Sequence, residues 1–242
     1  MKITKNMPQK NNPMLRETDA AYFIEHFFPV GITAGFTKNK IIGRLPEDSS
    51  SLLDMFDVST KLCYMEQTHS AVVNRAERDG LFGGDGLFTC LDDHLVVVRT
   101  ADCMPIVFYS EEKNIAGVVH MGWKPAVGGI LDNIGGDLSS FKVFVGVGLR
   151  KCCYEVGEEF LAYSRLNGFV TKNGGSCLFD PVDFIRTTLT SKGLLPDNFY
   201  DVNICSKCAV HKFPSYRRTG EKTRTLTFIV KRAVGSFLSR GE

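Results

Sequence analysis

Three short apolar runs in the middle of the chain place the strongest constraint on its fold. Each run is rich in β-branched and aromatic residues and lacks helical spacing, so each predicts a buried strand. The runs are HLVVVRT (94–100), MPIVFYS (104–110) and IAGVVH (115–120). Similar strand-like runs occupy residues 21–28, 31–37, 61–65, 70–76, 142–148, 198–205 and 223–232. Strands therefore supply most of the predicted elements.

A few segments predict helices between these strands. Residues 125–136 carry apolar side chains at helical spacing, and residues 157–166 also predict a helix. The clearest helix begins after Asp180, which can cap it, has Pro181 in its first turn and ends near Gly193. The Gly-rich stretch GLFGGDGLFT (80–89) predicts a turn. Strands mixed with a few helices, without regular β-α-β alternation, favour the α+β class.

Composition indicates a single globular domain. The chain has 242 residues, of which 43% are hydrophobic and 23% charged, and no linker divides it. We expect residues 1–20 to be loosely ordered and residues 21–242 to form the domain. The formal net charge of +2 gives no indication of a nucleic-acid partner. No apolar run is long enough for a transmembrane helix, and the polar N-terminus lacks a secretory signal, so we expect a cytoplasmic protein with no membrane partner.

The eight cysteines favour reduced thiols over a disulfide framework. Cys63, Cys90 and Cys177 lie within strand-like apolar runs, and no export signal precedes them. Residues 205–208 (CSKC) form a CxxC pair, which is weak support for a structural zinc site because a second pair at similar spacing is missing. Cys152 and Cys153 are adjacent rather than spaced.

Three residues with metal-binding side chains stand at or near the ends of predicted strands. They are His69 in QTHSAVV, Cys103 in RTADCMP and His120 in GVVHMGW. Three protein ligands leave a fourth position open, which is typical of a catalytic zinc site. A thiolate with two imidazoles suits zinc or copper, and we favour zinc because free copper is scarce in the cytoplasm. The long sequence separations do not prove convergence; a hydrogen-bonded histidine and a buried cysteine are the alternatives.

At these residues the sequence resembles the laccase-domain (YfiH-like) family, also described as polyphenol oxidoreductases and as purine nucleoside enzymes. The matching patches are QTHSAVV, GDGLFT, RTADCMPIVFY, AGVVHMGWKPAVGGI, CCYEVGEEF and FPSYRR, in this order. The resemblance covers roughly residues 21 to 232. It implies a single-domain α/β sandwich of mixed β-sheets flanked by helices. It also implies zinc bound by His69, Cys103 and His120.

The family resemblance implies a function in purine metabolism. Its members are associated with phosphorolysis of adenosine, inosine and methylthioadenosine and with deamination of adenosine, so the expected partners are a purine nucleoside and phosphate. Zinc lowers the pKa of bound water to about 7, which suits deamination. Arg99, Lys124, Arg217 and Arg218 are the candidate phosphate-binding residues because cations bind phosphate, arginine bidentately. Here Lys124 stands where the family usually has arginine, which keeps the charge but not the planar fork.

The catalytic assignment rests on His69, Cys103, His120 and Asp102. Asp102 adjoins the thiolate and could orient a ligand histidine or carry a proton; the alternative is an aspartate that bonds its own turn. Trp123 or Phe213 could stack on a purine, and Tyr154 and Glu155 could line the pocket. Alternatively, each could serve packing or solvation alone.

Other functions remain open at the level of the sequence. A copper-dependent polyphenol oxidase would use the same ligands, but a multicopper enzyme needs more histidines than the five present. A cysteine hydrolase acting on peptidoglycan precursors would use Cys103 as nucleophile and His120 as base. A non-enzymatic binding role is the remaining alternative. The oligomeric state is not predicted.

Overall fold

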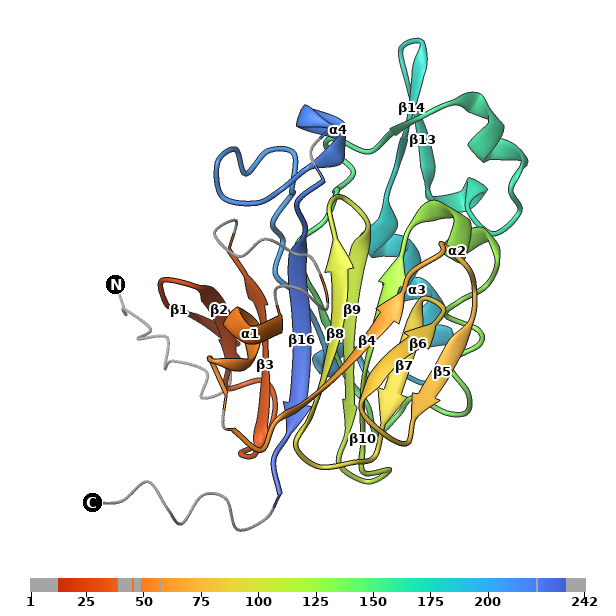
Figure 1. Cartoon of the computed structure of the whole chain (residues 1–242). Helices are drawn as coiled ribbons and strands as arrows, with labels where there is room; N and C mark the ends of the chain where they lie inside the picture. Colours follow the sequence, from red (N-terminus) through yellow and green to blue (C-terminus); the bar gives the residue numbers. More distant parts are fainter. Residues whose placement is uncertain (1–12, 39–44, 46–48, 57, 221, 234–242) are drawn as a thin grey trace, which may run out of the picture.

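The computed structural model describes residues 13–38, 45, 49–56, 58–220 and 222–233. Two mixed β-sheets lie face to face, and a small third sheet with short helices covers one end (Figure 1). This arrangement confirms the predicted α+β sandwich with mixed sheets. Within the part of the chain described, no helix is long and apolar enough to cross a membrane.

The first large sheet has seven strands in the order β1-β2-β3-β16-β8-β4-β6. Their bounds are β1 Met14–Glu17, β2 Ala21–Glu25, β3 Ile32–Thr37, β4 Lys61–Glu66, β6 Gly80–Gly83, β8 His94–Thr100 and β16 Thr225–Lys231. β16 pairs with both β3 and β8, so the C-terminal strand joins the N-terminal hairpins to the middle of the chain.

The second large sheet has six strands in the order β15-β11-β9-β10-β7-β5. Their bounds are β5 Val73–Ala76, β7 Gly86–Thr89, β9 Met104–Ser110, β10 Ile115–Met121, β11 Lys142–Val145 and β15 Phe199–Asp201. The antiparallel pair β9–β10 stands at its centre, and every residue of β9 is buried. Burial on both faces explains why these runs are continuously apolar in sequence.

The small sheet and the helices cover the remaining faces. Strands β12 Glu155–Val156, β14 Ser176–Phe179 and β13 Val170–Asn173 form the third sheet. Four α-helices are described: α1 Ser49–Leu53, α2 Trp123–Val127, α3 Pro181–Ser191 and α4 Tyr216–Thr219. Short 3₁₀ turns occupy Glu158–Ala162, Asn167–Phe169 and Pro196–Asn198.

Alternating side chains divide the core into layers. In β9, Val107 and Tyr109 face the seven-stranded sheet, whereas Ile106 and Phe108 pack in the cluster that contains α3 residues such as Ile185. This alternation is the period of two expected of a strand. A third cluster, under α1, covers the outer face of the seven-stranded sheet. Hydrophobic burial in these layers stabilises the central strands, whose ends carry the residues described in the next subsection.

The α3 helix agrees with its predicted start and end. The Asp180 side chain accepts a hydrogen bond from the Asp183 backbone N–H at 3.1 Å, and Pro181 opens the helix. Gly193 follows the helix with a φ of 95°, a conformation that favours glycine. Local capping chemistry therefore sets both ends of this helix.

Three other local predictions were wrong. The stretch 80–89 is not one turn but two strands, β6 and β7, because they join different sheets and Gly84 turns the chain between them with a φ of 115°. The helix predicted over 125–136 ends at Val127, shortly before Gly129 adopts a φ of 80°. The helix predicted over 157–166 is a 3₁₀ turn limited to Glu158–Ala162.

Part of the N-terminal segment pairs into the seven-stranded sheet. Residues 1–12 lie outside the described residues. Within the remainder of the segment expected to be loosely ordered, Met14–Glu17 forms β1 and pairs antiparallel with β2. An exposed ion pair from Arg16 Nε to Glu25 Oε1 at 2.6 Å links the two strands.

Candidate metal centre and its cavity

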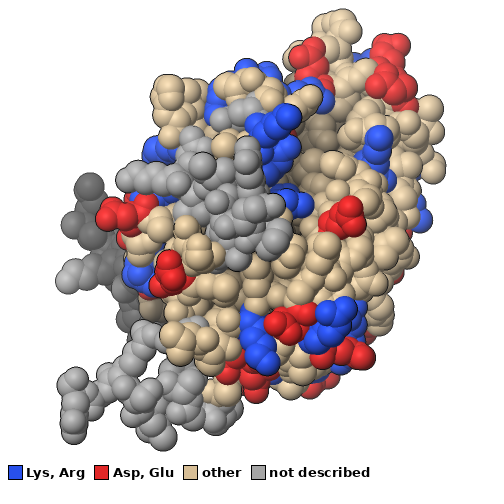
Figure 2. All heavy atoms as spheres, in the orientation of Figure 1, with Lys and Arg blue, Asp and Glu red and all other residues tan. Residues whose placement is uncertain are grey.

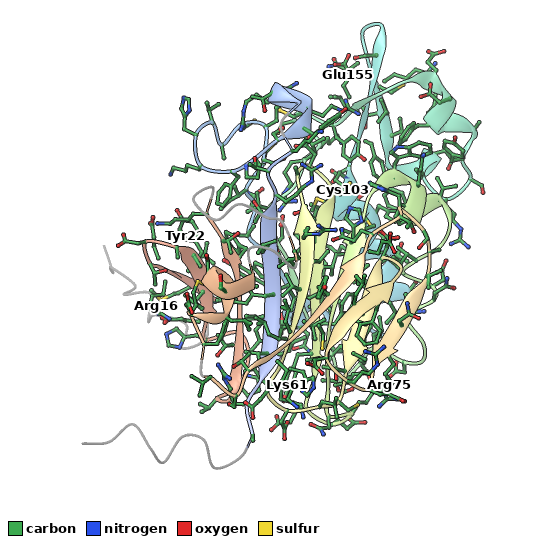
Figure 3. The ribbon with its side chains drawn as sticks, viewed as in Figure 1. Arg16, Tyr22, Lys61, Arg75, Cys103 and Glu155 are labelled. Carbon is green, nitrogen blue, oxygen red and sulfur yellow. The ribbon has the colours of Figure 1, made fainter. Side chains whose placement is uncertain are left out.

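The three predicted metal ligands meet at one end of the two large sheets. His69 lies in the loop after β4, Cys103 in the loop between β8 and β9, and His120 near the end of β10. Their ligand atoms all lie within 4.8 Å of one another, and Cys103 Sγ is 3.9 Å from His69 Nε2. Figure 3 places Cys103 at the upper ends of the central strands. The fold thus brings together residues far apart in sequence.

Asp85 fixes both histidine-bearing segments. This carboxylate is fully buried, and its Oδ1 is 2.7 Å from His120 Nδ1. It also accepts hydrogen bonds from the backbone N–H groups of Thr68, His69 and Ser70, at 3.3, 3.1 and 2.6 Å, and from the Ser70 hydroxyl at 2.8 Å. A carboxylate behind a histidine fixes the ring orientation and leaves the other ring nitrogen for a metal.

The charges at the centre depend on these contacts. Burial alone would raise the pKa of Asp85, but hydrogen bonds from His120 and Ser70 hold it below its ordinary value. Burial likewise opposes ionisation of the Cys103 thiol, but hydrogen bonds with His120 and His69 lower its pKa to about 6. Burial favours the neutral ring of His120 and alone would lower its pKa. The hydrogen bonds and negative charges of Asp85 and Cys103 outweigh this effect and raise the pKa of His120 to about 9. These contacts favour the thiolate form of Cys103.

The donor set and its spacing fit one zinc ion. Zinc–sulfur and zinc–nitrogen bond lengths in a tetrahedral site place two ligand atoms about 3.3–3.8 Å apart. The 3.9 Å between Cys103 Sγ and His69 Nε2 is close to this range. Gly122 leaves the necessary space, because a Cβ there would lie 2.9 Å from Cys103 Sγ and 3.3 Å from His69 Cδ2.

The Gln67 side chain connects the loop that carries His69 to the end of β8, just before the loop that carries Cys103. The Gln67 side chain donates to the Arg99 carbonyl at 2.8 Å and accepts from the Arg99 N–H at 2.9 Å. His69 and Asp102 adopt positive φ angles of 58° and 90°, which are uncommon for residues other than glycine. Strained conformations of this kind persist where the surrounding structure determines them.

Asp102 is held by two donors rather than directed at a ligand histidine. Its Oδ1 accepts from the Ser206 hydroxyl at 2.7 Å, and its Oδ2 accepts from the Arg217 backbone N–H at 2.6 Å. Asp102 thereby ties the Cys103 loop to the segment 205–219. The carboxylate that orients the His120 ring is Asp85, which the sequence pattern places only within a predicted Gly-rich turn.

A cavity of about 730 Å³ opens beside the three ligands. Besides the ligands, its lining is rich in cations and aromatic rings: Arg99, Lys124, Arg217, Lys222, Arg224, Trp123, Tyr154 and Tyr216. Figure 2 shows Lys and Arg gathered around a hollow in the upper part of the molecule. Such a lining suits an anionic group and a flat ring system. A larger hollow, of about 1100 Å³, adjoins His26 and Tyr200 and contains none of the three ligands.

The other candidate residues divide between the cavity and the framework. Arg99, Lys124 and Arg217 line the cavity, and Arg217 Nη1 also donates to the Glu155 carbonyl at 2.7 Å. Arg218 instead donates to the backbone carbonyls of Ser206, Lys207 and Phe213 and shapes the loop.

The two aromatic candidates for purine stacking are also separated. Trp123 lies in the cavity wall, with Phe160 and Tyr163 packed against it at centroid distances of 5.5 and 5.9 Å. Phe213 is buried in the core beside Phe36. Tyr154 is also at the cavity wall, and burial raises its pKa. Its hydroxyl is therefore neutral at physiological pH.

Comparison with known proteins gives consistent matches over most of the chain. Residues 43–232 match the family described as multi-copper polyphenol oxidoreductase laccase. A purine nucleoside phosphorylase from Borreliella burgdorferi is 32% identical over 77% of this chain and 86% of its own length. An adenosine deaminase from an unknown prokaryotic organism is 29% identical over 72% of each chain.

Solved structures share the fold. The crystal structure of YlmD from Geobacillus stearothermophilus superposes with a TM-score of 0.80 and 22% identity, covering 92% of this chain and all of that one. The Bacillus licheniformis protein YfiH gives a TM-score of 0.80 at 20% identity, covering 90% of this chain and 99% of that one.

Proposed function

Because the chain belongs to the multi-copper polyphenol oxidoreductase laccase family, a family of enzymes, we propose that it is a zinc-dependent purine nucleoside phosphorylase. One observation carries the proposal. The cavity beside His69, Cys103 and His120 combines several cations with aromatic walls. Two relatives named purine nucleoside phosphorylase, each more than 30% identical, support the choice of substrate.

His69, Cys103 and His120 would hold the zinc ion, which supplies Lewis acidity and positive charge next to the cavity. Asp85 keeps the His120 ring in the orientation that leaves Nε2 toward the centre. The Cys103 thiolate offers a soft anionic donor that suits zinc.

The cations of the cavity would bind and orient phosphate. Arg217 approaches from α4, Arg99 from the end of β8 and Lys124 from α2. Arginine binds phosphate oxygens bidentately, and three positive side chains from separate elements fix its orientation. Positioning of this kind converts an encounter between two substrates into a reaction within one complex.

In phosphorolysis, a phosphate oxygen forms a bond to ribose C1′ while the bond from C1′ to the purine nitrogen breaks. The purine leaves with the bonding electrons and takes up a proton, and ribose 1-phosphate is the second product. Trp123 and Tyr154 would hold the purine ring against the cavity wall, and Tyr154, as a neutral phenol, can donate a hydrogen bond.

The test is product identification with metal-assayed protein. Inosine and adenosine are incubated with and without phosphate, and the products are identified by mass. The proposal predicts ribose 1-phosphate and free base only when phosphate is present. Turnover that is independent of phosphate, or absence of any product, would contradict it.

Adenosine deamination is a second candidate, favoured by the relative named adenosine deaminase. The same residues and aromatic walls would accommodate attack of water at purine C6, which forms the C6–O bond and releases ammonia as the C6–N bond breaks. The two activities are separated by the same assay, because deamination of adenosine yields inosine and requires no phosphate.

Two rival chemistries would use the same residues and make different predictions. A cysteine hydrolase acting on peptidoglycan precursors would exploit the low pKa of the Cys103 thiol, survive chelation and be inactivated by alkylation. A copper-dependent polyphenol oxidase would contain stoichiometric copper. We propose zinc, and metal analysis of protein purified without added metal decides between them.

A further inference from the structure

A second cluster of metal-binding side chains lies outside the cavity described above. The sulfur atoms of Cys152, Cys153, Cys205 and Cys208 all lie within 4.8 Å of one another. Cys208 Sγ is 3.8 Å from Cys152 Sγ and 3.3 Å from Cys153 Sγ. The adjacent pair and the CxxC pair, separated by about fifty residues of sequence, thus converge on one point.

We propose that these four cysteines bind a structural zinc ion. Zinc–sulfur bonds of about 2.3 Å in a tetrahedral site place neighbouring sulfur atoms about 3.8 Å apart. The distance from Cys208 Sγ to Cys152 Sγ is 3.8 Å, and the distance to Cys153 Sγ is shorter, at 3.3 Å. An iron–sulfur cluster would need wider spacing, because iron and inorganic sulfide would lie between the thiolates. Four protein ligands close the coordination sphere, so this site is structural rather than catalytic.

Two turns present the sulfur atoms to one another. The backbone N–H groups of Cys153 and Tyr154 both donate to the Arg150 carbonyl, at 2.8 and 2.9 Å, and this turn directs two successive cysteines toward the same side. In the other turn the Ala209 N–H donates to the Cys205 carbonyl at 2.9 Å. The backbone N–H groups of Lys207 and Cys208 also face the Cys205 sulfur.

The four cysteines lie at the boundary between the surface and the interior of the protein. Cys152 and Cys208 are exposed, whereas Cys205 is buried. The site is therefore anchored on its inner side and open to metal exchange on its outer side.

The cluster joins two segments that border the cavity. Residues 149–154 contribute Leu149 and Tyr154 to the cavity wall, and the segment after Cys205 contributes Arg217. The backbone already links them, since the Ser206 N–H donates to the Gly148 carbonyl at 3.0 Å. The Ser206 hydroxyl in turn holds Asp102 beside the ligand Cys103. A zinc ion here would fix the wall of the cavity without touching substrate.

Cadmium-113 NMR of the full chain tests the site directly. The protein is loaded with ¹¹³Cd²⁺ in place of zinc, and each bound ion resonates at a shift set by its number of sulfur ligands. The proposal predicts a resonance in the tetrathiolate range that is retained in the C103A variant. Absence of that resonance, iron with acid-labile sulfide, or an intramolecular disulfide among these cysteines in freshly purified protein would overturn it.

Metal content of matched variants provides a second measurement. We expect Cys208→Ser to lose about one zinc ion per chain relative to wild type, and Cys90→Ser, outside both clusters, to lose none. If the C208S variant is insoluble, its metal analysis is replaced by a titration of the reactive thiols of the wild-type protein, before and after chelation of the metal. Reactive thiols at Cys152 and Cys208 should then appear only after chelation. Because C103A removes a ligand of the cavity alone, this test can succeed or fail independently of the proposed function.

Discussion

Replacing Asp85 by asparagine should weaken both the fold and the metal centre. Asp85 is fully buried and accepts hydrogen bonds from four donors besides His120 Nδ1, at 2.6–3.3 Å. Asparagine has nearly the same shape, but it removes the negative charge and turns one acceptor oxygen into a donor. That new donor would face the N–H groups that Asp85 now accepts from.

The expected magnitude follows from the burial of this network. Removing one partner of a buried charged pair costs about 3–5 kcal/mol. For a chain of this size, this corresponds to a Tm lower by about 6–20 °C. Loss of a carboxylate behind a ligand histidine lowers metal affinity about 10–100-fold. D85N should therefore show both effects together.

Calorimetry and zinc competition with a chromophoric chelator measure the two effects. The matched control is Asp132→Asn, which removes an exposed carboxylate paired with Arg165 and should cost about 0–1 kcal/mol. If D85N matches D132N in Tm and in zinc affinity, then Asp85 does not organise the centre and the reasoning is refuted.

Three further changes probe the cavity and the fold. Gly122→Ala should lower zinc affinity about tenfold or more, because its Cβ would lie 2.9 Å from Cys103 Sγ. Gly135→Ala is the control, since a Cβ there would have nothing within 4 Å and should leave zinc affinity unchanged. Equal zinc-competition curves for the two variants would contradict this prediction. In initial-rate assays, Arg217→Ala should raise the KM for phosphate about tenfold, because Arg217 lines the cavity. Lys172→Ala, which removes only an exposed ion pair, should leave this KM unchanged. Equal KM values for the two variants would exclude Arg217 from phosphate binding. Asp180→Ala should destabilise the protein by about 1 kcal/mol in urea titration through loss of the α3 cap, and an unchanged midpoint would remove that role.

The strands at the centre of the fold are predictable because burial on both faces requires continuous apolar runs in the sequence. β8, β9 and β10 coincide with the apolar runs, apart from one residue at the end of β10. The α3 helix is equally predictable from Asp180 and Pro181. In contrast, β6 and β7 are short and Gly-rich, and their partners in two different sheets make them strands. Tertiary pairing of this kind leaves no local pattern to read.

The three residues that converge at the centre were predicted from side-chain chemistry, but the residues that support them were not. His69, Cys103 and His120 stand out because thiolate and imidazole are good zinc donors. No sequence pattern singles out Asp85, since its role arises from the turn that places its carboxylate beside His120 Nδ1. Cys152 and Cys153 were set aside for their adjacency, and only the fold brings them to Cys205 and Cys208.

The most direct test of the central claim is anomalous diffraction at the zinc edge from crystals of protein purified without added metal. If His69, Cys103 and His120 hold zinc, an anomalous peak lies within bonding distance of all three, next to the cation-lined cavity. A map with no anomalous peak between these three residues would contradict this claim. A peak that persists at an energy between the copper and zinc edges would also contradict it, because copper scatters anomalously there and zinc does not.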